Sequence, residues 1–482
     1  MHTYKELYIG GEWVAPAGNG FIEVVSPASE EVIGQVPDGT TTDIDAAVAA
    51  ARLAFDQGPW PHLNPVERAA VLGRFSAAIQ ARMQDFADLI SSQNGSPKSW
   101  SIMGQVLSST MVLDSYVGFA ETYRWVDTRT SMMGGTTRVR RAPVGVVAAI
   151  TPWNVPLFIA ALKLGPALVA GCTVVLKPAP ETPLDSFLLA EAAIEAGLPA
   201  GVLNIVPAGR ESGEHLVRHP GIDKVSFTGS TAAGMKIGEI CGAQLKRCTL
   251  ELGGKSAAIV LDDVQFDDAL MGELVMSGMM NNGQVCGAQS RILVPRSRYA
   301  EIVDQLGAAV AALVVGDPLD DATQVGPLVA ERQRTRVEGY LEAGKAAGAR
   351  VVTGGGRPAD LPKGWYIEPT VFADVDNSMT IAQEEIFGPV LSVIPYDGED
   401  QAVAIANDSE YGLCGSVWTA DVHHGEQVAA RVRTGVVAIN SSTILDFNSP
   451  FGGFKKSGIG RELGPEGIDP FTEYQSIILP AG

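Results

Sequence analysis

The run Pro143-Val144-Gly145-Val146-Val147-Ala148-Ala149-Ile150 is apolar from end to end and rich in the small and β-branched residues of a buried strand. Four more short runs of this kind follow, separated by Ala- and Leu-rich stretches of helical character, at 173–176, 202–206, 224–227 and 257–261. Apolar strands that alternate with helices are typical of a parallel sheet covered on both sides. We therefore predict a doubly wound α/β domain whose ligand site lies beyond the carboxyl ends of the strands.

Helical spacing dominates the sequence before this run, and a second α/β series comes after it. Apolar residues recur at helical spacing between about Asn64 and Asp127, with a break at Asn94-Gly95-Ser96-Pro97. The second series has strand candidates at 291–295, 351–352 and 389–395 and ends in the Gly-rich stretch 450–454. A chain of 482 residues is too long for one hydrophobic core. We expect two or three domains, with no sharp linker between them.

The composition excludes several classes of function. The chain carries 35 Lys and Arg against 55 Asp and Glu, and a net charge of −20 would repel the phosphates of a nucleic acid. Its apolar runs stop well short of the roughly 20 residues that a membrane-spanning helix needs. The first seven residues resemble neither a secretory signal nor a transit peptide. We expect a cytoplasmic protein that binds neither nucleic acid nor a membrane.

The cysteines and histidines argue against a disulfide framework and a metal site. The five cysteines are odd in number, widely spread and contain no C-x-x-C pair, so we expect free thiols. The six histidines form no H-E-x-x-H motif, and we expect no metal. Cys172 and Cys414 lie in apolar runs, whereas Cys241 and Cys248 flank a helix-to-strand turn. We interpret these four as packing residues.

Cys286 has a different neighbourhood. Asn281-Asn282-Gly283-Gln284 comes shortly before it and Gly287 follows it, a setting that allows close backbone approach and leaves N–H groups free beside the sulfur. Cys286 is the best candidate nucleophile. On these residues alone an inert thiol stays an equal alternative.

A carboxylate stands at the end of another predicted strand, in Leu250-Glu251-Leu252-Gly253-Gly254-Lys255-Ser256. An inward-facing Glu251 would be costly unless it is paired or has a chemical role, and the alternative is an edge-strand Glu that faces water. The Gly-Lys-Ser ending resembles a phosphate-binding P-loop, but that motif requires Gly where Thr249 stands. We reject the nucleotide triphosphatase interpretation.

Two further strand ends are candidates for nucleotide binding. Gly229 and Ser230 follow the run 224–227, where the glycine would allow a tight turn and the serine would cap a helix whose N-terminus faces a pyrophosphate. An ordinary capped turn explains the same pattern. Lys177 ends the run 173–176 before the proline-rich turn Pro178-Ala179-Pro180, where it would bind a ribose or phosphate or simply be solvated.

Taken together, these segments resemble the aldehyde dehydrogenase superfamily over nearly the whole chain. The similar stretches, in order, are TPWNVP (151–156), KLGPAL (163–168), KPAP (177–180), FTGS (227–230), LELGGK (250–255), GQVC (283–286), EEIFGP (384–389) and PFGGFKKSG (450–458). The resemblance implies an aldehyde dehydrogenase-like fold with two doubly wound α/β domains and a small β oligomerisation segment. It also implies oxidation of an aldehyde to a carboxylic acid with NAD(P)+.

The resemblance assigns roles to five catalytic residues. Cys286 attacks the aldehyde carbonyl, and the Asn154 amide with the backbone N–H of Cys286 holds the oxyanion. Hydride loss leaves a thioester, which water activated by Glu251 hydrolyses. Lys163 and Glu462 are implied as a proton relay, with a structural ion pair as the alternative.

It also assigns the cofactor site, implied to be formed by Trp153, Lys177, Pro180, Gly229, Ser230, Leu252, Glu384 and Phe387. Lys177 resembles the ribose-binding lysine, Gly229 and Ser230 the pyrophosphate turn, and Glu384 the residue that binds the nicotinamide ribose. Pro180 is a departure, because NAD-preferring relatives often carry Glu there, so NADP is possible although NAD is favoured. Glu181, one position further on, is a partial substitute.

By resemblance, residues 1–124 and 144–250 form the cofactor domain and 251–450 the catalytic domain, while 125–143 and 468–482 form the oligomerisation segment. We expect a dimer or tetramer. The rivals are an acylating relative that uses coenzyme A, a non-catalytic binding protein, and a cofactor-free thiol hydrolase. An apolar tunnel is expected from Val155, Ile159, Leu162, Val285 and Phe447, which favours an uncharged aliphatic or aromatic aldehyde.

Overall fold

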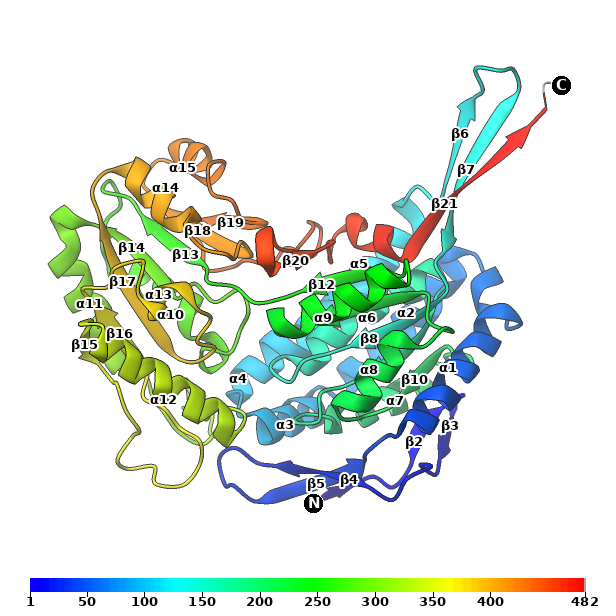
Figure 1. The fold of residues 1–482 in the computed structure, drawn as a ribbon, viewed down its shortest axis with the longest axis horizontal. Helices are drawn as coiled ribbons and strands as arrows, with labels where there is room; N and C mark the ends of the chain where they lie inside the picture. Colours follow the sequence, from blue (N-terminus) through cyan, green and yellow to red (C-terminus); the bar gives the residue numbers. More distant parts are fainter. Residues whose placement is uncertain (481–482) are drawn as a thin grey trace.

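The computed structural model describes residues 1–480, which form two α/β lobes and a projecting β arm (Figure 1). Both lobes are sheets covered by helices on two faces, so the predicted fold class is confirmed. The described residues contain no helix that is both long and apolar enough to cross a membrane.

The first lobe contains an eight-stranded sheet in the order β20-β12-β11-β8-β9-β10-β2-β3. Its strands are β2 (Leu7–Ile9), β3 (Glu12–Val14), β8 (Val146–Ile150), β9 (Thr173–Lys177), β10 (Leu203–Ile205), β11 (Lys224–Thr228), β12 (Arg247–Glu251) and β20 (Gly458–Ile459). The five strands from β12 to β10 are parallel. β20 at one edge, and β2 and β3 at the other, each pair with their neighbours in antiparallel orientation. The antiparallel additions were not predicted, because the strands are only two or three residues long.

Alternation along these strands divides the apolar side chains between two helical layers. Val147 and Ala149 pack with α2 (Pro65–Ala81), α5 (Ser108–Thr122), α6 (Pro156–Ala170) and α7 (Leu184–Glu195). Val146 and Ala148 pack with α1 (Thr41–Asp56), α8 (Arg210–Arg218) and α9 (Thr231–Ala243) on the other face. The predicted helical block is confirmed as α2, α3 (Met83–Asn94), α4 (Lys98–Trp100), a π-helix (Ser101–Leu107) and α5.

The second lobe contains a seven-stranded sheet in the order β15-β16-β17-β14-β13-β18-β19, parallel except for β15. Its strands are β13 (Ala257–Val260), β14 (Arg291–Pro295), β15 (Arg350–Thr353), β16 (Thr370–Ala373), β17 (Val390–Tyr396), β18 (Cys414–Trp418) and β19 (Val436–Ile439). Its helices are α10 (Asp268–Met279), α11 (Tyr299–Ala311), α12 (Glu331–Ala346), α13 (Thr380–Gln383), α14 (Glu399–Asn407) and α15 (Val422–Ala429).

One strand prediction was wrong in its placement. The run 257–261 was grouped with the first series, but β13 lies inside the second sheet, between β14 and β18. The extended segment Leu252–Ser256 follows β12 and carries the chain from one lobe to the other. The order of the strands along the sequence therefore gave no sign that the chain crosses to the second sheet before β13.

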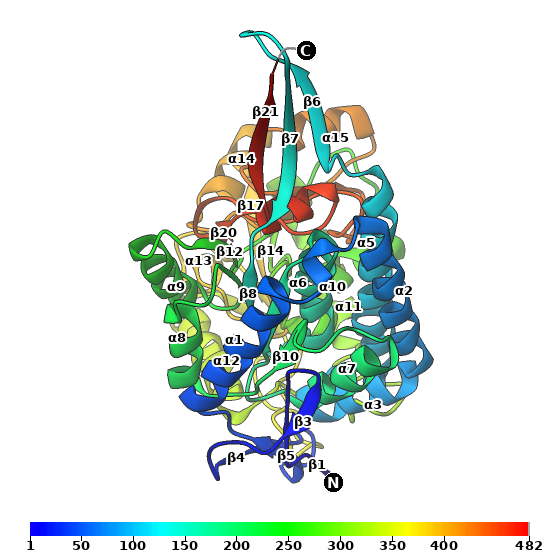
Figure 2. The ribbon, with the colours of Figure 1, turned by 90° about the vertical axis from the view of Figure 1, so that its right-hand side faces the viewer.

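The projecting arm is a three-stranded antiparallel sheet in the order β21-β7-β6 (Figures 1 and 2). It consists of β6 (Val126–Thr130), β7 (Thr136–Pro143) and β21 (Thr472–Leu479), so the two segments predicted for oligomerisation lie together. Residues 481–482 of the second segment lie outside the described residues. On β21 the side chains of Tyr474 and Ile478 are largely exposed.

Candidate functional site

A cleft of about 540 Å³ opens at the carboxyl ends of the first sheet's strands. Its walls come from both lobes and contain many of the predicted residues; they are Pro152, Trp153, Asn154, Ile159, Arg210, Thr228, Gly229, Ser230, Gly253, Cys286, Arg332, Gln333, Arg336, Glu385 and Phe387. This is the place at which a doubly wound sheet binds its ligand, as the sequence predicted.

Cys286 lies on a loop with an unusual backbone. Asn281, Asn282 and Gly283 are consecutive residues with φ values of 51°, 60° and 69°, all in the left-handed region. Asn tolerates this region better than most residues. At Gly283 an added Cβ would lie 2.1 Å from the carbonyl oxygen of Gly388, so only glycine fits. The polar residues before Cys286 therefore shape the loop that presents its thiol.

Side-chain amides fasten this loop to distant segments. Asn282 donates to the carbonyl oxygens of Gly95 at 2.8 Å and Pro327 at 3.0 Å, and its own oxygen accepts from the Gly326 N–H at 2.6 Å. Gln284 accepts from the Val329 N–H at 3.1 Å. The sequence pattern shows these amides but not that they hold the loop in place.

Asn154 lies in the cleft with one amide N–H available. Its Nδ2 donates to the Gln284 carbonyl at 2.8 Å, which leaves the second N–H of the amide for a ligand. Its backbone carbonyl accepts from the amides of Asn94, Gln105 and Asn281 at 3.0, 3.3 and 3.1 Å. Asn154 is thus held in place by hydrogen bonds at both its side-chain amide and its backbone carbonyl.

The Cys286 thiol is partly exposed to the cleft and is protonated at rest. Burial, together with the nearby carboxylates Glu385 and Glu251, raises the pKa of Cys286 to about 12. The backbone N–H groups of Gly287 and Cys286 are directed at the sulfur and oppose this shift. A reaction at this sulfur therefore needs a group that removes its proton.

Glu251 faces inward at the end of β12, so the solvent-facing alternative was wrong. Its side chain is 3% exposed, and neither carboxylate oxygen has a hydrogen-bond partner within residues 1–480. Burial raises the pKa of Glu251 well above its ordinary value; the charge of Glu462 adds to the rise, while Lys163 and Arg461 oppose it. Gly452 leaves room for this carboxylate, because a Cβ there would lie 2.7 Å from Oε1.

Lys163 and Glu462 form a fully buried ion pair with an N–O distance of 2.9 Å. The same Lys163 ammonium donates to Thr228 at 2.7 Å and Ser226 at 3.3 Å. The pair acts electrostatically on Glu251 from the side of the sheet opposite α9.

Of the predicted nucleotide-binding residues, Gly229 and Ser230 line the cleft, whereas Lys177 and Pro180 are not among the residues of its walls. Ser230 caps α9, since its hydroxyl accepts from the Ala233 N–H at 3.3 Å, and Gly229 lines the cleft just before it. Lys177 is buried and donates to the carbonyls of Pro178 and Ala208 at 3.0 and 2.7 Å. Burial lowers the pKa of Lys177 to about 8, although the charges of Glu181 and Asp38 act against this.

Trp153 and Phe387 form an aromatic wall of the cleft. Their rings meet edge to face, with centroids 5.3 Å apart and an interplanar angle of 88°. Leu252 was predicted to bind the cofactor, but it does not line the cleft. It is buried in the core beneath Gly234 of α9, and Gly253 lines the cleft instead.

Glu384, predicted for the cofactor site, does not line the cleft, whereas the next residue, Glu385, does. Glu384 is exposed and accepts from the Tyr340 hydroxyl at 2.7 Å. Glu385 lines the cleft and accepts from the Gly254 N–H at 2.9 Å. Burial raises the pKa of Glu385 to about 7, while Arg336 and Lys255 oppose the rise. The backbone at Glu384 is extended, so neighbouring side chains point in opposite directions.

Three arginines in the cleft wall were not predicted: Arg210, Arg332 and Arg336. Arg332 pairs with Glu181, the residue after Pro180, so that carboxylate is already occupied. Nothing in the sequence pattern marked these arginines: Arg210 begins α8, and Arg332 and Arg336 lie in the first turns of α12.

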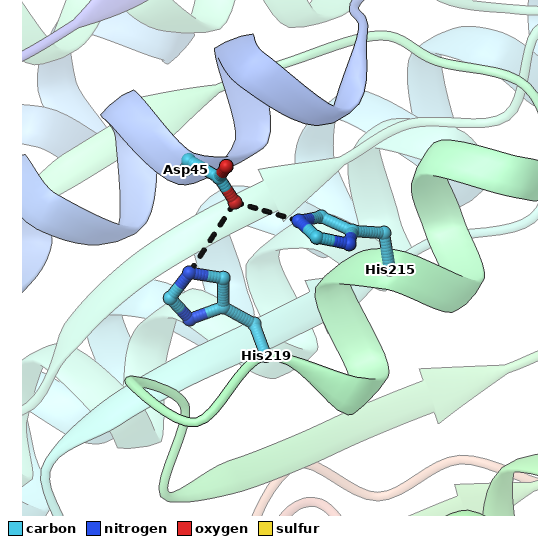
Figure 3. A group of neighbouring side chains, drawn as sticks. All are labelled: Asp45, His215 and His219. Atoms are coloured by element: carbon cyan, nitrogen blue, oxygen red, sulfur yellow. Dashed lines mark hydrogen bonds and ion pairs between the residues drawn. The ribbon is translucent and has the colours of Figure 1, made fainter.

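Away from the cleft, Asp45, His215 and His219 meet between α1 and α8 (Figure 3). The Asp45 carboxylate lies 2.6 Å from His215 and 3.4 Å from His219, in each case from Nε2. His219 accepts the Gly221 N–H at its Nδ1, so its ring proton is on Nε2 and faces Asp45. A metal would need the lone pair at that position. The cluster therefore suits a hydrogen-bonded link between helices.

Comparison with known proteins extends these observations. The sequence model of the aldehyde dehydrogenase family matches residues 13–477. A geranial dehydrogenase of Castellaniella defragrans is 51% identical over 478 residues, covering 99% of each chain. An NAD+ complex of a Mycobacterium tuberculosis aldehyde dehydrogenase superposes with a TM-score of 0.98 at 53% identity, covering 100% of this chain and 99% of that one. A Pseudomonas syringae aldehyde dehydrogenase C variant with NAD+ and octanal gives 0.95 at 42%, covering 98% and 96%.

Proposed function

This chain belongs to the aldehyde dehydrogenase family and is an NAD(P)-dependent aldehyde dehydrogenase, and on that premise we propose that it works through a thioester on Cys286. The observation that carries the proposal is that Cys286 and Asn154 line one cleft, while the buried Glu251, which has no hydrogen-bond partner within residues 1–480, is near enough for its charge to act on the Cys286 thiol. The same residues separate it from the rival functions. A non-catalytic protein has no use for a buried, partnerless carboxylate, which is costly to keep.

In the first step the Cys286 sulfur bonds to the aldehyde carbon. The thiol proton is released to solvent in the cleft, and the carbonyl oxygen becomes an oxyanion, which leaves Glu251 ionised for the later step. The free N–H of the Asn154 amide and the backbone N–H of Cys286 donate to that oxygen. The result is a hemithioacetal held in a fixed orientation.

A bound nicotinamide supplies the acceptor for the hydride that this adduct loses on its way to the thioester. Glu251 then accepts a proton from water as the water oxygen bonds to the thioester carbon. The carbon–sulfur bond breaks, the Cys286 sulfur leaves as thiolate, and the product is a carboxylic acid. Glu251 in this position favours hydrolysis over transfer to coenzyme A.

The residues of the cleft fit NAD. Gly229 and the Ser230-capped start of α9 offer backbone N–H groups for a pyrophosphate, and Arg210 and Arg336 add positive charge. Lys177 has one N–H beyond its two carbonyl bonds for a ribose hydroxyl. Neither Pro180 nor the arginine-paired Glu181 presents a free carboxylate against a 2′-phosphate. We propose NAD as the main cofactor, with NADP accepted more weakly.

Glu385 rather than Glu384 is proposed to bind the nicotinamide ribose, and adjacent substitutions test this. Glu385→Gln should raise the KM for NAD+ and lower kcat about tenfold or more, because a ribose hydroxyl loses an ionised acceptor. Glu384→Gln, which changes an exposed residue whose carboxylate accepts from the Tyr340 hydroxyl, should leave both within about twofold. Initial rates over a range of NAD+ concentrations measure the difference. Equal effects of the two changes would contradict the assignment.

We propose an uncharged aliphatic or isoprenoid aldehyde as the substrate. Two similar proteins support this substrate class: one is named geranial dehydrogenase, and the structure of another contains octanal. The expected tunnel residues Val155, Ile159 and Leu162 are buried and apolar. Absorbance of reduced nicotinamide across a panel of citral, octanal, benzaldehyde and succinic semialdehyde, with NAD+ and NADP+, tests the proposal. The first two should have the highest kcat/KM; a preference for succinic semialdehyde would overturn the substrate class.

The arm supports a proposal of self-association. Strand β21 lies at the edge of its sheet, with unpaired backbone groups along one side and exposed Tyr474 and Ile478 side chains. Such an edge can pair with a strand of a second copy. We propose a dimer or tetramer that uses this arm.

A further inference from the structure

Helix α9 lies over strand β12, and its contacts with the strand follow a regular spacing. A Cβ at Gly234 would lie 2.3 Å from Leu252, and a Cβ at Gly238 would lie 3.5 Å from Leu250. Four residues forward along the helix thus correspond to two residues back along the strand, because each step is about 6 Å long. One further step of the same spacing places the last turn of α9 beside Cys248 of β12.

Cys241 lies on that last turn and is in direct contact with Cys248. The two thiols are hydrogen-bonded to each other, in the apolar layer between the helix and the sheet. The chain turns between them, and the Lys246 N–H closes the turn by donating to the Cys241 carbonyl at 2.9 Å. Cys241 is fully buried, whereas Cys248 is partly exposed. The pair therefore consists of an inner and an outer thiol.

Cys248 differs in acidity from the other thiols of residues 1–480. The hydrogen bond with Cys241 lowers the pKa of Cys248 below its ordinary value, and the Lys224 ammonium on β11 also lowers it, while burial acts in the opposite direction. The four thiols with a raised pKa are Cys172, Cys241, Cys286 and Cys414. Because the thiolate is the form that oxidants attack, Cys248 is the cysteine that we expect to react first.

We propose that Cys241 and Cys248 form a reversible oxidation site, which a peroxide converts to a disulfide while Cys286 in the cleft stays reduced. The Cys248 thiolate sulfur bonds to one peroxide oxygen, the O–O bond breaks, and hydroxide leaves and takes a proton from solvent. This gives a sulfenic acid on Cys248. The Cys241 sulfur then bonds to the Cys248 sulfur, the S–O bond breaks, and the hydroxyl leaves with the Cys241 proton as water. Two thiols are oxidised and one peroxide is reduced.

The oxidation site is separate from the cleft. Ser230 at the start of α9 lines the cleft, whereas Cys241 lies near the opposite end of this helix. Glu251 is the last residue of β12, whereas Cys248 is its second. Neither cysteine is among the residues of the cleft walls. The inference therefore does not depend on the proposed function, and its test needs neither an aldehyde nor turnover.

Peptide mapping after mild oxidation tests the site directly. The intact enzyme is treated with an equimolar amount of hydrogen peroxide, the remaining thiols are alkylated, and the chain is digested with trypsin without reductant. Cleavage after Lys236, Lys246 and Arg247 places the two cysteines in separate peptides, 237–246 and 248–255. Mass spectrometry should find these two peptides joined by a disulfide, and dithiothreitol should release both. Their absence as a linked pair from the oxidised enzyme would overturn the proposal.

The same map measures selectivity against Cys286. Oxidation of Cys248 should be at least about tenfold faster than that of Cys286, since the pKa of Cys248 is lowered and that of Cys286 is raised. Faster oxidation of Cys286 would refute the selectivity. Cys172→Ser is the matched control, because Cys172 is a buried thiol of the same lobe that donates to the Phe471 carbonyl at 3.4 Å. The linked peptides should form in this variant as in the wild type.

Single substitutions distinguish the outer thiol from the inner one. Cys241→Ser keeps a hydrogen-bond donor beside Cys248 but removes the second sulfur, so oxidation should stop at a sulfenic acid that dimedone traps on Cys248. Cys248→Ser should give no dimedone adduct on Cys241, because that thiol is fully buried and its pKa is raised. An adduct on Cys241 in this variant would contradict the proposed order of attack. If either variant does not fold, the wild-type map still decides whether the disulfide forms.

Discussion

Cys286→Ala should abolish aldehyde-dependent reduction of NAD+, with kcat lowered by at least about 10⁴, because Cys286 is the only thiol among residues 1–480 that lines the cleft. Binding of NAD+ should be unchanged, since the substitution removes only one atom next to the cofactor site. Stopped-flow absorbance measures the loss of turnover, and fluorescence titration measures cofactor binding.

Cys248→Ala is the control for this experiment. Cys248 is also a half-buried free thiol, but it lies in the apolar layer under α9 and far along β12 from the cleft. Its replacement should leave kcat within about twofold. Turnover that survives in Cys286→Ala, or is lost equally in both variants, would remove the basis for the thioester proposal.

Glu251→Gln should leave the formation of the thioester fast and make its hydrolysis very slow. Glutamine has nearly the same volume but cannot accept a proton from water, so hydrolysis should slow by about 10² to 10⁴. A single burst of reduced nicotinamide, close to one per active site, should come before this slow phase. Mass spectrometry of the quenched enzyme should find the acyl group on Cys286.

The wild-type pH profile follows from the same carboxylate. Only ionised Glu251 can accept a proton, and burial with the charge of Glu462 raises its pKa well above the ordinary value. Steady-state turnover should therefore rise with pH through that raised pKa and fall as the medium becomes acid. If Glu251→Gln shows no burst of reduced nicotinamide and its turnover keeps the wild-type pH dependence, the assignment of Glu251 as base is contradicted.

Sequence motifs located the candidate site well because its main residues sit at strand ends and tight turns. Glu251, Gly229 and Lys177 each follow a short apolar run, and parallel strands bring such ends to one edge of the sheet. Patterning could not choose between Glu384 and Glu385, since both are polar and only the twist of one extended residue decides which enters the cleft.

Long-range features were beyond the sequence for a different reason. The buried hydrogen bond from Lys224 of β11 to Thr249 of β12 depends on which strands pair and in which register, and this is fixed only by the completed sheet. The same is true of β13, whose apolar run fits either lobe equally well. Local pattern identifies a strand but not its neighbours.

The amide clamp on the Cys286 loop has a consequence for how the enzyme matures. Asn282 bonds the carbonyl of Gly95, 187 positions earlier in the chain, and the carbonyl of Pro327, 45 positions later. Contacts between such distant segments form late in folding, after local helices and neighbouring strands. In a newly made chain the Cys286 loop therefore reaches its final geometry only when both lobes have docked. A partly folded molecule would carry the thiol without the geometry that makes it useful, which limits side reactions during synthesis.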